Sequence, residues 1–526
     1  MTTKEIVIPS TMSTQHPDNA SLPVWANSTV IEGEAELEEA FVAYSEFGCN
    51  EVMWDSEGKD VDTNVVRKLL SNYPDFFRKS IIGENIFLTY RIPNPRIEVA
   101  ERKIVTETLQ SIPLSADVCS VFYERQAVPV FEVILPFSTS GKELIWLYEY
   151  YRRAIAGVEN LKLDGSIAVK NWVGRFTPRK VRVIPLVEDE DSLLNIDRIA
   201  LEYVKAVKPD YLRVFIARSD PALNYGLVAA TMLAKIALSK LAVVEESTGV
   251  KIHPLIGVGT MPFRGHLSPD NVEKFLEEYQ GLSTVTTQSA MRYDYPPSKV
   301  KKAISLLNSH LPNGMAARID QHDETALRGI LGKLIPVYQR RIEGLAGLIN
   351  GIAAYVPPRR ARKLHIGLFG YSRRVKGVVM PRAIPFAAAF YSLGIPPEFI
   401  GAEALRNLTD TEFELIRSNY LNMHSDLAFA GTYVSWESIN MLMDLTEKVA
   451  KRAGMMKDQL ESSLAGLMAD LASVEEFFSL HLAPRNHTDK RHANFINNFL
   501  ISYIDGDEEE ARKAFLEAAT LRQCIG

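Results

Sequence analysis

Cysteine is scarce in this chain, and long apolar runs are missing. Its 526 residues include three cysteines, Cys49, Cys119 and Cys524, which lie far apart. This spacing excludes a disulfide scaffold and a CxxC metal site, and it is typical of a reducing cytoplasm. The first residues, MTTKE, contain no apolar signal segment, and no uninterrupted apolar stretch approaches the ~20 residues that span a bilayer. We therefore expect a cytoplasmic protein with no membrane partner.

An excess of charge of one sign is missing as well. The formal net charge is -6 at pH 7, so the chain has no strong positive field to attract nucleic acid or anionic lipid. Hydrophobic residues make up 46% of the chain and charged residues 24%, which excludes a disordered or fibrous protein. We expect a folded enzyme-sized protein whose partners are small molecules, with no role for nucleic acid.

The most informative positive feature is a repeated unit, an apolar β-branched run that ends abruptly in a polar or charged side chain. Two copies are residues 183–188 (VIPLVE) and 214–220 (VFIARSD), and a helical pattern rich in Leu, Ile and Ala follows each. Continuous apolar runs of this length suit strands that are buried on both faces of a parallel sheet. Ligands bind at the carboxyl ends of such strands, so Glu188 and Asp220 are expected to share one site.

Five more segments have the same character, which makes seven candidate strands. They are residues 51–55, 85–91, 129–136, 183–188, 214–220, 252–260 and 283–288. Strands that alternate with helical patterns over about 240 residues predict an α/β fold of the (β/α)8 TIM-barrel type, with a doubly wound open sheet as the second choice. The eighth strand is not obvious. Residues 364–369 (LHIGLF) are a candidate, but the same pattern fits a buried helix or a loop equally well.

The carboxyl-terminal part of the sequence is helical in pattern. From about residue 398 the periodicity is that of helices, for example over residues 409–420 and 507–521. No linker or low-complexity tract marks an independent unit. We expect residues 1–400 to form the barrel with an N-terminal catalytic segment, and residues 401–526 to form additional helices packed on it.

Glu188 and Asp220 are candidate metal ligands. They supply hard oxygen atoms from successive strands, and two carboxylates with waters and substrate oxygens are a usual arrangement for Mg2+ or Mn2+. The alternative is that each acid caps the helix that follows it. This alternative is strong for Asp220, which precedes Pro221 at an expected first helical turn.

Arginines gather in segments with turn chemistry. Guanidinium groups match phosphate and carboxylate oxygens and stay charged at any working pH, so several of them on loops at strand ends suit a small phosphorylated dianion. A single arginine is more often a solvated surface group. The candidates are Arg91, Arg264, Arg373, Arg374 and Arg382.

A histidine lies in the segment of residues 13–19, STQHPDN. Because Pro17 restricts the backbone of His16, the imidazole can be held in one place, and histidine is the usual general acid or base near neutral pH. The alternative is that a polar segment this early in the sequence is a loose tail.

These segments resemble a known family, the archaeal-type phosphoenolpyruvate carboxylases. The resemblance covers essentially the whole chain. It is carried by four blocks in order: residues 13–19 (STQHPDN), 258–267 (VGTMPFRGHL), 288–296 (QSAMRYDYP) and 368–373 (LFGYSR).

The resemblance implies a (β/α)8 barrel with added helices and a homotetramer. It also implies roles for individual residues. His16, Arg264 and Arg91 match catalytic positions, and Glu188 and Asp220 match the acids that bind Mg2+ or Mn2+. The positions expected to bind substrate are Arg373, Arg382, Gln288 and Arg374.

The reaction that the resemblance implies is the irreversible carboxylation of phosphoenolpyruvate by bicarbonate, which gives oxaloacetate and phosphate through carboxyphosphate and an enolate. Two other readings of the residues remain. One is a Mg2+-dependent barrel aldolase or lyase of 2-oxo acids, which shares the metal acids but has no need of the arginine set. The other is a non-catalytic barrel that binds a metabolite.

Overall fold

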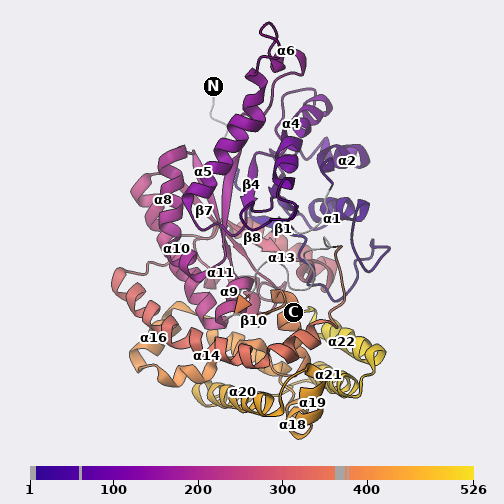
Figure 1. Cartoon of the computed structure of the whole chain (residues 1–526), viewed down its shortest axis with the longest axis vertical. Helices are drawn as coiled ribbons and strands as arrows, with labels where there is room; N and C mark the ends of the chain where they lie inside the picture. Colours follow the sequence, from indigo (N-terminus) through magenta and orange to yellow (C-terminus); the bar gives the residue numbers. More distant parts are fainter. Residues whose placement is uncertain (1–6, 58–61, 362–373, 376–377) are drawn as a thin grey trace.

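The chain forms a closed barrel of eight parallel strands. The computed structural model describes residues 7–57, 62–361, 374–375 and 378–526. The strands follow one another around the barrel in sequence order (Figure 1). They are β1 (Thr11–Ser13), β2 (Glu51–Asp55), β3 (Phe87–Arg91), β4 (Glu132–Leu135), β5 (Arg182–Val187), β6 (Tyr211–Ala217), β7 (Lys251–Gly257) and β8 (Thr284–Thr287). The predicted TIM-type barrel is therefore confirmed, and so are the seven predicted strands.

The eighth strand is β1, which the sequence prediction missed. It pairs with β2 on one side and with β8 on the other, where Thr11 lies opposite Val285 and Ser13 opposite Thr287. The segment predicted instead, residues 364–369, lies outside the described residues. Strand β1 has only three residues, and two of them are buried hydroxyl side chains. Such a segment lacks the apolar run by which buried strands are recognised.

The inside of the barrel is filled by side chains. An apolar cluster there is separate from the larger core between strands and helices. Its members are Met12, Met53, Ile134, Ile184, Leu186, Phe215, Ala217 and Leu255. Since strand residues alternate between the two faces of the sheet, the same runs supply both cores.

One layer inside the barrel is charged. The guanidinium group of Arg213 donates hydrogen bonds to both oxygens of Glu51, at 2.8 and 2.7 Å, and to Glu132 at 2.9 Å. It also donates to the hydroxyl of Thr284 at 3.2 Å. These four residues come from β6, β2, β4 and β8, which is the alternate-strand layering of TIM barrels. The layer lies near the amino ends of the strands, since Glu51, Glu132 and Thr284 each begin their strand.

Helices cover the outside of the barrel. They are α1 (Glu34–Ser45), α2 (Val65–Asn72), α3 (Pro74–Phe77), α4 (Ile104–Phe122), α5 (Gly141–Tyr150), α6 (Val169–Trp172), α7 (Glu190–Leu194), α8 (Ile196–Val207), α9 (Ser219–Tyr225), α10 (Leu227–Thr248), α11 (Val272–Glu278), α12 (Ser289–Tyr293) and α13 (Pro297–His310). Helix α10 is long and apolar enough to cross a membrane by composition, but 72% of its apolar window is buried. It contacts α8, β7 and the later helix α14 (Gln321–Ala353), so its apolar composition follows from its place in the core.

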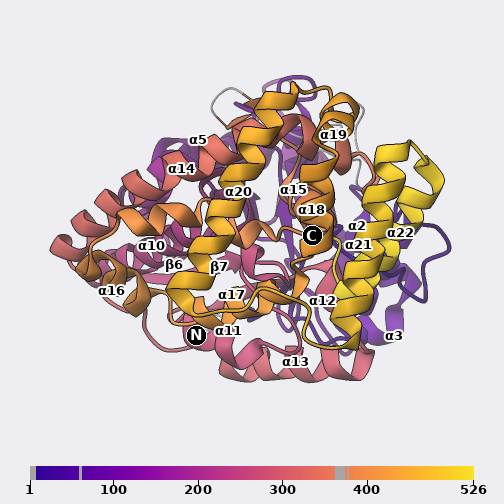
Figure 2. The same ribbon diagram turned by 90° about the horizontal axis from the view of Figure 1, so that it is seen from below.

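The remaining helices form a layer beside the barrel, in the lower half of Figure 1. They are α14 (Gln321–Ala353), α15 (Ala383–Ser392), α16 (Asp410–Asn419), α17 (Met423–Ala430), α18 (Trp436–Asp444), α19 (Thr446–Ala453), α20 (Lys457–Phe478), α21 (His487–Asp505) and α22 (Glu508–Arg522). A short hairpin of β9 (Arg374–Val375) and β10 (Val378–Val379) lies between α14 and α15 in the sequence. Figure 2 looks onto this layer, with α14 and α20 running across it and the α21–α22 hairpin at its side. Helices α14 and α15 contact both α9 and the later helices, so they join the layer to the barrel.

Candidate functional site

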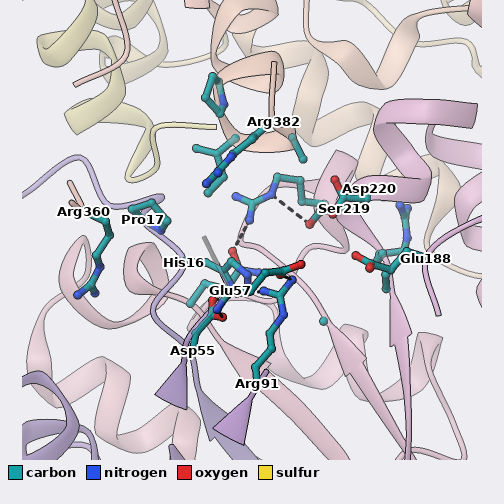
Figure 3. Close-up of a pocket in the computed structure, with 18 of the residues that line it drawn as sticks. His16, Pro17, Asp55, Glu57, Arg91, Glu188, Ser219, Asp220, Arg360 and Arg382 are labelled. Atoms are coloured by element: carbon teal, nitrogen blue, oxygen red, sulfur yellow. Dashed lines mark hydrogen bonds and ion pairs between the residues drawn. The ribbon is translucent and has the colours of Figure 1, made fainter. Parts of the chain in front are cut away.

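A cavity of about 460 Å³ lies at the carboxyl ends of the barrel strands. Side chains that follow β2, β5 and β6 form its floor, and residues 356–360 and 382–385 close it from the helical layer. Figure 3 shows Arg91 entering from the strand side and Arg382 from the opposite side. The predicted site residues that line this cavity are His16, Arg91, Glu188, Asp220, Arg264, Gln288 and Arg382.

Two of the predicted arginines are not placed in the cavity. Arg373 lies outside the described residues. Arg374 belongs to β9, where only its backbone is described. Their expected contacts with substrate therefore stay predictions.

The two predicted metal acids lie at the ends of neighbouring strands. Glu188 directly follows β5, and its Oε2 accepts a hydrogen bond from the backbone N–H of Phe137 at 2.9 Å. The next helix, α7, is capped by Asp189, whose carboxylate accepts from the N–H of Ser192. Asp220 is the second residue of α9, whose N-cap position belongs to Arg218. Neither acid is the N-cap residue of the helix that follows it, which weakens the capping alternative.

The pKa of Glu188 is raised to about 8. Burial is the largest cause, because it disfavours the charged carboxylate, and the negative charge of Asp220 adds to it while Arg91 opposes it. A buried pair of carboxylates that repel one another is strongly stabilised by a cation between them. The donor set therefore fits a hard divalent cation such as Mg2+ or Mn2+.

Arg91 lies among carboxylates that the sequence analysis did not single out. It ends β3, forms an ion pair with Glu57 and approaches Asp55 at 3.3 Å. Burial alone would lower the pKa of Arg91, but Glu57 and Asp55 outweigh it and raise that pKa. The guanidinium group is thus charged and oriented before any ligand arrives. Asp55 is the last residue of β2, so the pattern of an apolar run that ends in a polar side chain could have identified it as a site residue.

Arg264 is held from several sides. Its Nε donates to the hydroxyl of Ser219 at 3.2 Å and its Nη1 to Asp18 at 3.0 Å. Nη2 donates to the amide oxygen of Gln288, and Nη1 also contacts the main-chain oxygen of Gly526. A Cβ at Gly259 would lie 2.8 Å from the guanidinium carbon, so any side chain there would displace the guanidinium group from its partners. The loop after β7 is therefore shaped around Arg264.

His16 reaches the cavity from the segment that follows β1. Its Nδ1 lies 3.0 Å from the hydroxyl of Thr14, and the ring is half-buried at the cavity wall beside Pro17 (Figure 3). Thr14 is hydrogen-bonded through its backbone N–H to the carbonyl of Thr287 in β8. The segment is thus an extension of a barrel strand, which rules out the loose-tail alternative.

Comparison with known proteins agrees with this geometry. A family model described as "Phosphoenolpyruvate carboxylase" matches residues 8–526. The chain belongs to the phosphoenolpyruvate carboxylase family. A phosphoenolpyruvate carboxylase of Metallosphaera sedula is 45% identical over 519 residues, which cover 99% of both chains. A phosphoenolpyruvate carboxylase of Caldivirga maquilingensis is 44% identical over 523 residues, which cover 99% of this chain and 100% of the other. One of Methanothermobacter thermautotrophicus is 48% identical over 431 residues, which cover 82% of this chain and 88% of the other.

This phosphoenolpyruvate carboxylase family member also has cavity arginines that the sequence analysis missed. Arg359 donates to the main-chain oxygens of Asn19 at 3.1 Å and Ala20 at 2.7 Å, and Arg360 forms an ion pair with Glu39. Both line the cavity. The pattern Pro-Pro-Arg-Arg at residues 357–360 is a turn signal with two adjacent cations, which is the same signal that singled out the other arginines.

Proposed function

We propose that the protein carboxylates phosphoenolpyruvate with bicarbonate and releases oxaloacetate and phosphate. One observation carries the proposal: a histidine, two metal-type acids and several arginines converge on one cavity at the carboxyl end of the barrel. An anion with a phosphate and a carboxylate needs cationic side chains, and an enolate needs a nearby cation to stabilise its oxygen.

Glu188 and Asp220 would hold Mg2+ or Mn2+, and the ion supplies positive charge near the phosphate and enolate oxygens when it is bound. Arg264 and Arg382 would bind the phosphate as it moves to bicarbonate, with Gln288 beside Arg264. Arg91, already oriented by Glu57 and Asp55, would hold a second anionic group.

His16 would act as the general base. A ring nitrogen of His16 would accept the proton of carboxyphosphate, so that carbon dioxide forms beside the enolate. A general base of this kind typically raises the reaction rate about 10²- to 10⁴-fold. Water must be kept away, because a proton added to the enolate gives pyruvate. Residues 356–360 and 382–385, which close the cavity from the helical layer, would serve this exclusion.

The direct test is a coupled assay with malate dehydrogenase. With phosphoenolpyruvate, bicarbonate and Mg2+, we expect NADH oxidation and phosphate release in equal amounts, both dependent on bicarbonate. A barrel aldolase or lyase would release no phosphate, and a metabolite-binding protein would bind phosphoenolpyruvate without turnover. Either result would contradict the proposal. Replacing Mg2+ with Mn2+ in the same assay identifies the preferred ion.

We further propose a cytoplasmic homotetramer, as the family resemblance implies. A supporting observation is the exposed apolar surface near α5 and α6, where Trp146 is 62% and Trp172 73% exposed. Large aromatic side chains are enriched in protein–protein interfaces. Light scattering after gel filtration measures the assembly, and a monomeric mass would contradict this part of the proposal.

A further inference from the structure

Asp18 is a fully buried carboxylate two residues after His16, and it does not line the cavity. An ionised side chain is costly to bury unless its oxygens are hydrogen-bonded and its charge is paired. Both conditions are met at Asp18, and the groups that meet them come from two different parts of the site.

One oxygen of Asp18 faces Arg264. Its Oδ2 accepts from Nη1 of Arg264 at 3.0 Å, and the two side chains are 0% and 2% exposed. This ion pair is shielded from water, and it places a fixed negative charge behind the guanidinium group. Arg264 in turn reaches the cavity, where the reacting phosphate is proposed to lie.

The other oxygen of Asp18 faces the start of α12. Its Oδ1 accepts from the N–H of Ala290 at 2.7 Å and lies 2.9 Å from the hydroxyl of Ser289. The same hydroxyl accepts from the N–H of Asp18 at 2.9 Å and lies within hydrogen-bonding distance of the carbonyl of His16. This side of the network therefore fixes the backbone that carries the imidazole.

We propose that Asp18 is a positioning residue that holds the general base and the phosphate-binding arginine in one fixed arrangement. His16 and Arg264 come from opposite parts of the sequence, after β1 and after β7. The Asp18 carboxylate contacts Arg264 directly and His16 through Ser289. The inference rests on the proposed function, because the roles of His16 and Arg264 belong to it.

The first variant is Asp18→Asn, with Asp294→Asn as its matched control. Asp294 is also a cavity-remote carboxylate bound to this segment, through the N–H groups of Ala20 at 2.7 Å and Ser21 at 2.6 Å. Asparagine at position 18 has one acceptor oxygen where the carboxylate has two, so either Arg264 or the N–H of Ala290 would face an NH2 group, and in both cases Arg264 loses its charge partner. We expect kcat to fall at least about tenfold with a smaller change in KM, because the lost interaction acts on the transition state. We expect Asp294→Asn to keep kcat within about twofold.

A double-mutant cycle separates positioning from general destabilisation. If Asp18 acts through Arg264, then Asp18→Asn in an Arg264→Gln background, where the ion pair is already absent, costs no more than about threefold in kcat, since coupled residues are not additive. Equal losses in both backgrounds, or a kcat for Asp18→Asn that matches Asp294→Asn, would overturn the proposal.

Ser289→Ala tests the other side of the network and serves if Asp18→Asn does not fold. It leaves the ion pair between Asp18 and Arg264 and loosens the His16 backbone, so the pyruvate share of the products should rise. An unchanged product ratio would contradict the link to His16. These outcomes all require an active unmodified protein, so failure of the proposed function is seen separately, as absence of bicarbonate-dependent phosphate release.

Discussion

At the residue scale, we propose that the imidazole of His16 decides whether the enolate becomes oxaloacetate or pyruvate. Its place at the cavity wall, beside Pro17 and bound to Thr14, follows from its position just after β1. The arginines and the metal acids are the groups proposed to transfer phosphate. Proton removal from carboxyphosphate is assigned to His16 alone.

The variant His16→Asn should therefore separate phosphate transfer to bicarbonate from carboxylation of the enolate. We expect bicarbonate-dependent phosphate release to continue, while oxaloacetate falls by about 10² or more and pyruvate replaces it, because the base is missing. Lactate dehydrogenase and malate dehydrogenase assays on the same sample measure the two products. A normal yield of oxaloacetate would show that His16 is not the base.

The raised pKa of Glu188 predicts that protons compete with the metal ion. A carboxylate whose pKa lies near 8 is mostly protonated at pH 6.5, and a metal ligand must lose its proton. Mn2+ affinity should therefore rise between pH 6.5 and pH 8.5, by about tenfold per pH unit at most. Titration followed by electron paramagnetic resonance measures it, with Glu188→Gln as the control, which should bind weakly at both pH values. A pH-independent affinity in the unmodified protein would contradict the shift.

At the element scale, the strands and helices show which sequence signals were sufficient. The long apolar runs that became β5, β6 and β7 were predictable, because strands buried on both faces need them. The signal failed for β1, whose three residues are held in the barrel by backbone pairing and by contacts such as that of Thr11 with Asn308. Asp18 was missed for a related reason, since its partner Arg264 is distant in the sequence and no local pattern marks it. Arg359 is different, because it lies in the turn signal Pro-Pro-Arg-Arg and could have been singled out from the sequence.

The charged layer inside the barrel links four strands, and its stability depends on Arg213. In Arg213→Met the carboxylates of Glu51 and Glu132 stay buried without their cation, which costs about 3 to 5 kcal/mol. We expect a clear loss of thermal stability in calorimetry. The triple variant with Glu51→Gln and Glu132→Gln should recover much of it, because no uncompensated charge remains. A single variant as stable as the unmodified protein would show that the layer does not support the barrel.

The α21–α22 hairpin contains a buried histidine that predicts acid sensitivity. Nη1 of Arg522 lies 2.9 Å from Nε2 of His492, and burial followed by the charge of Arg522 lowers the pKa of His492 well below its usual value. The unfolded chain takes up a proton below about pH 6.5 and the folded chain does not. Stability should therefore fall as the pH drops below about 6.5, by about 1.4 kcal/mol per pH unit at most.

Melting temperatures from pH 8 to pH 5 test this expectation. The variant His492→Gln cannot take up the proton, so its melting temperature should depend less on pH over the same range. Equal pH dependence in the two proteins would show that His492 does not carry the effect.

At the scale of the whole molecule, the barrel and the helical layer share the site. The barrel supplies the acids and His16, while Arg359 and Arg382 come from segments that lead into the layer. The (β/α)8 class and the later helices were predictable from alternating and helical periodicity. The closure of one cavity by the barrel and the helical layer together was not predictable, since it depends on packing between residues hundreds of positions apart.

We propose that residues 401–526 do not fold apart from the barrel, as the sequence suggested. Helices α14 and α15 pack against both parts, and every residue of α15 except Pro385 is buried. Calorimetry of the full chain should show one cooperative transition, and a chain ending at residue 400 should be insoluble or inactive, because it would expose the apolar face of α15. Two separate transitions, or an active shortened chain, would contradict a single unit.

The closing pair of the barrel ties activity to complete assembly. Strand β1 is the first to be made on the ribosome, and its partner β8 lies more than 270 residues later. Until residue 287 has emerged, the segment with His16 can pair with β2 on one side only, and Arg264 lacks its partner Gln288. We therefore expect a partly made chain to bind no phosphoenolpyruvate and to release no pyruvate, because the ring that brings His16 and Arg264 to one cavity closes only when β8 is added.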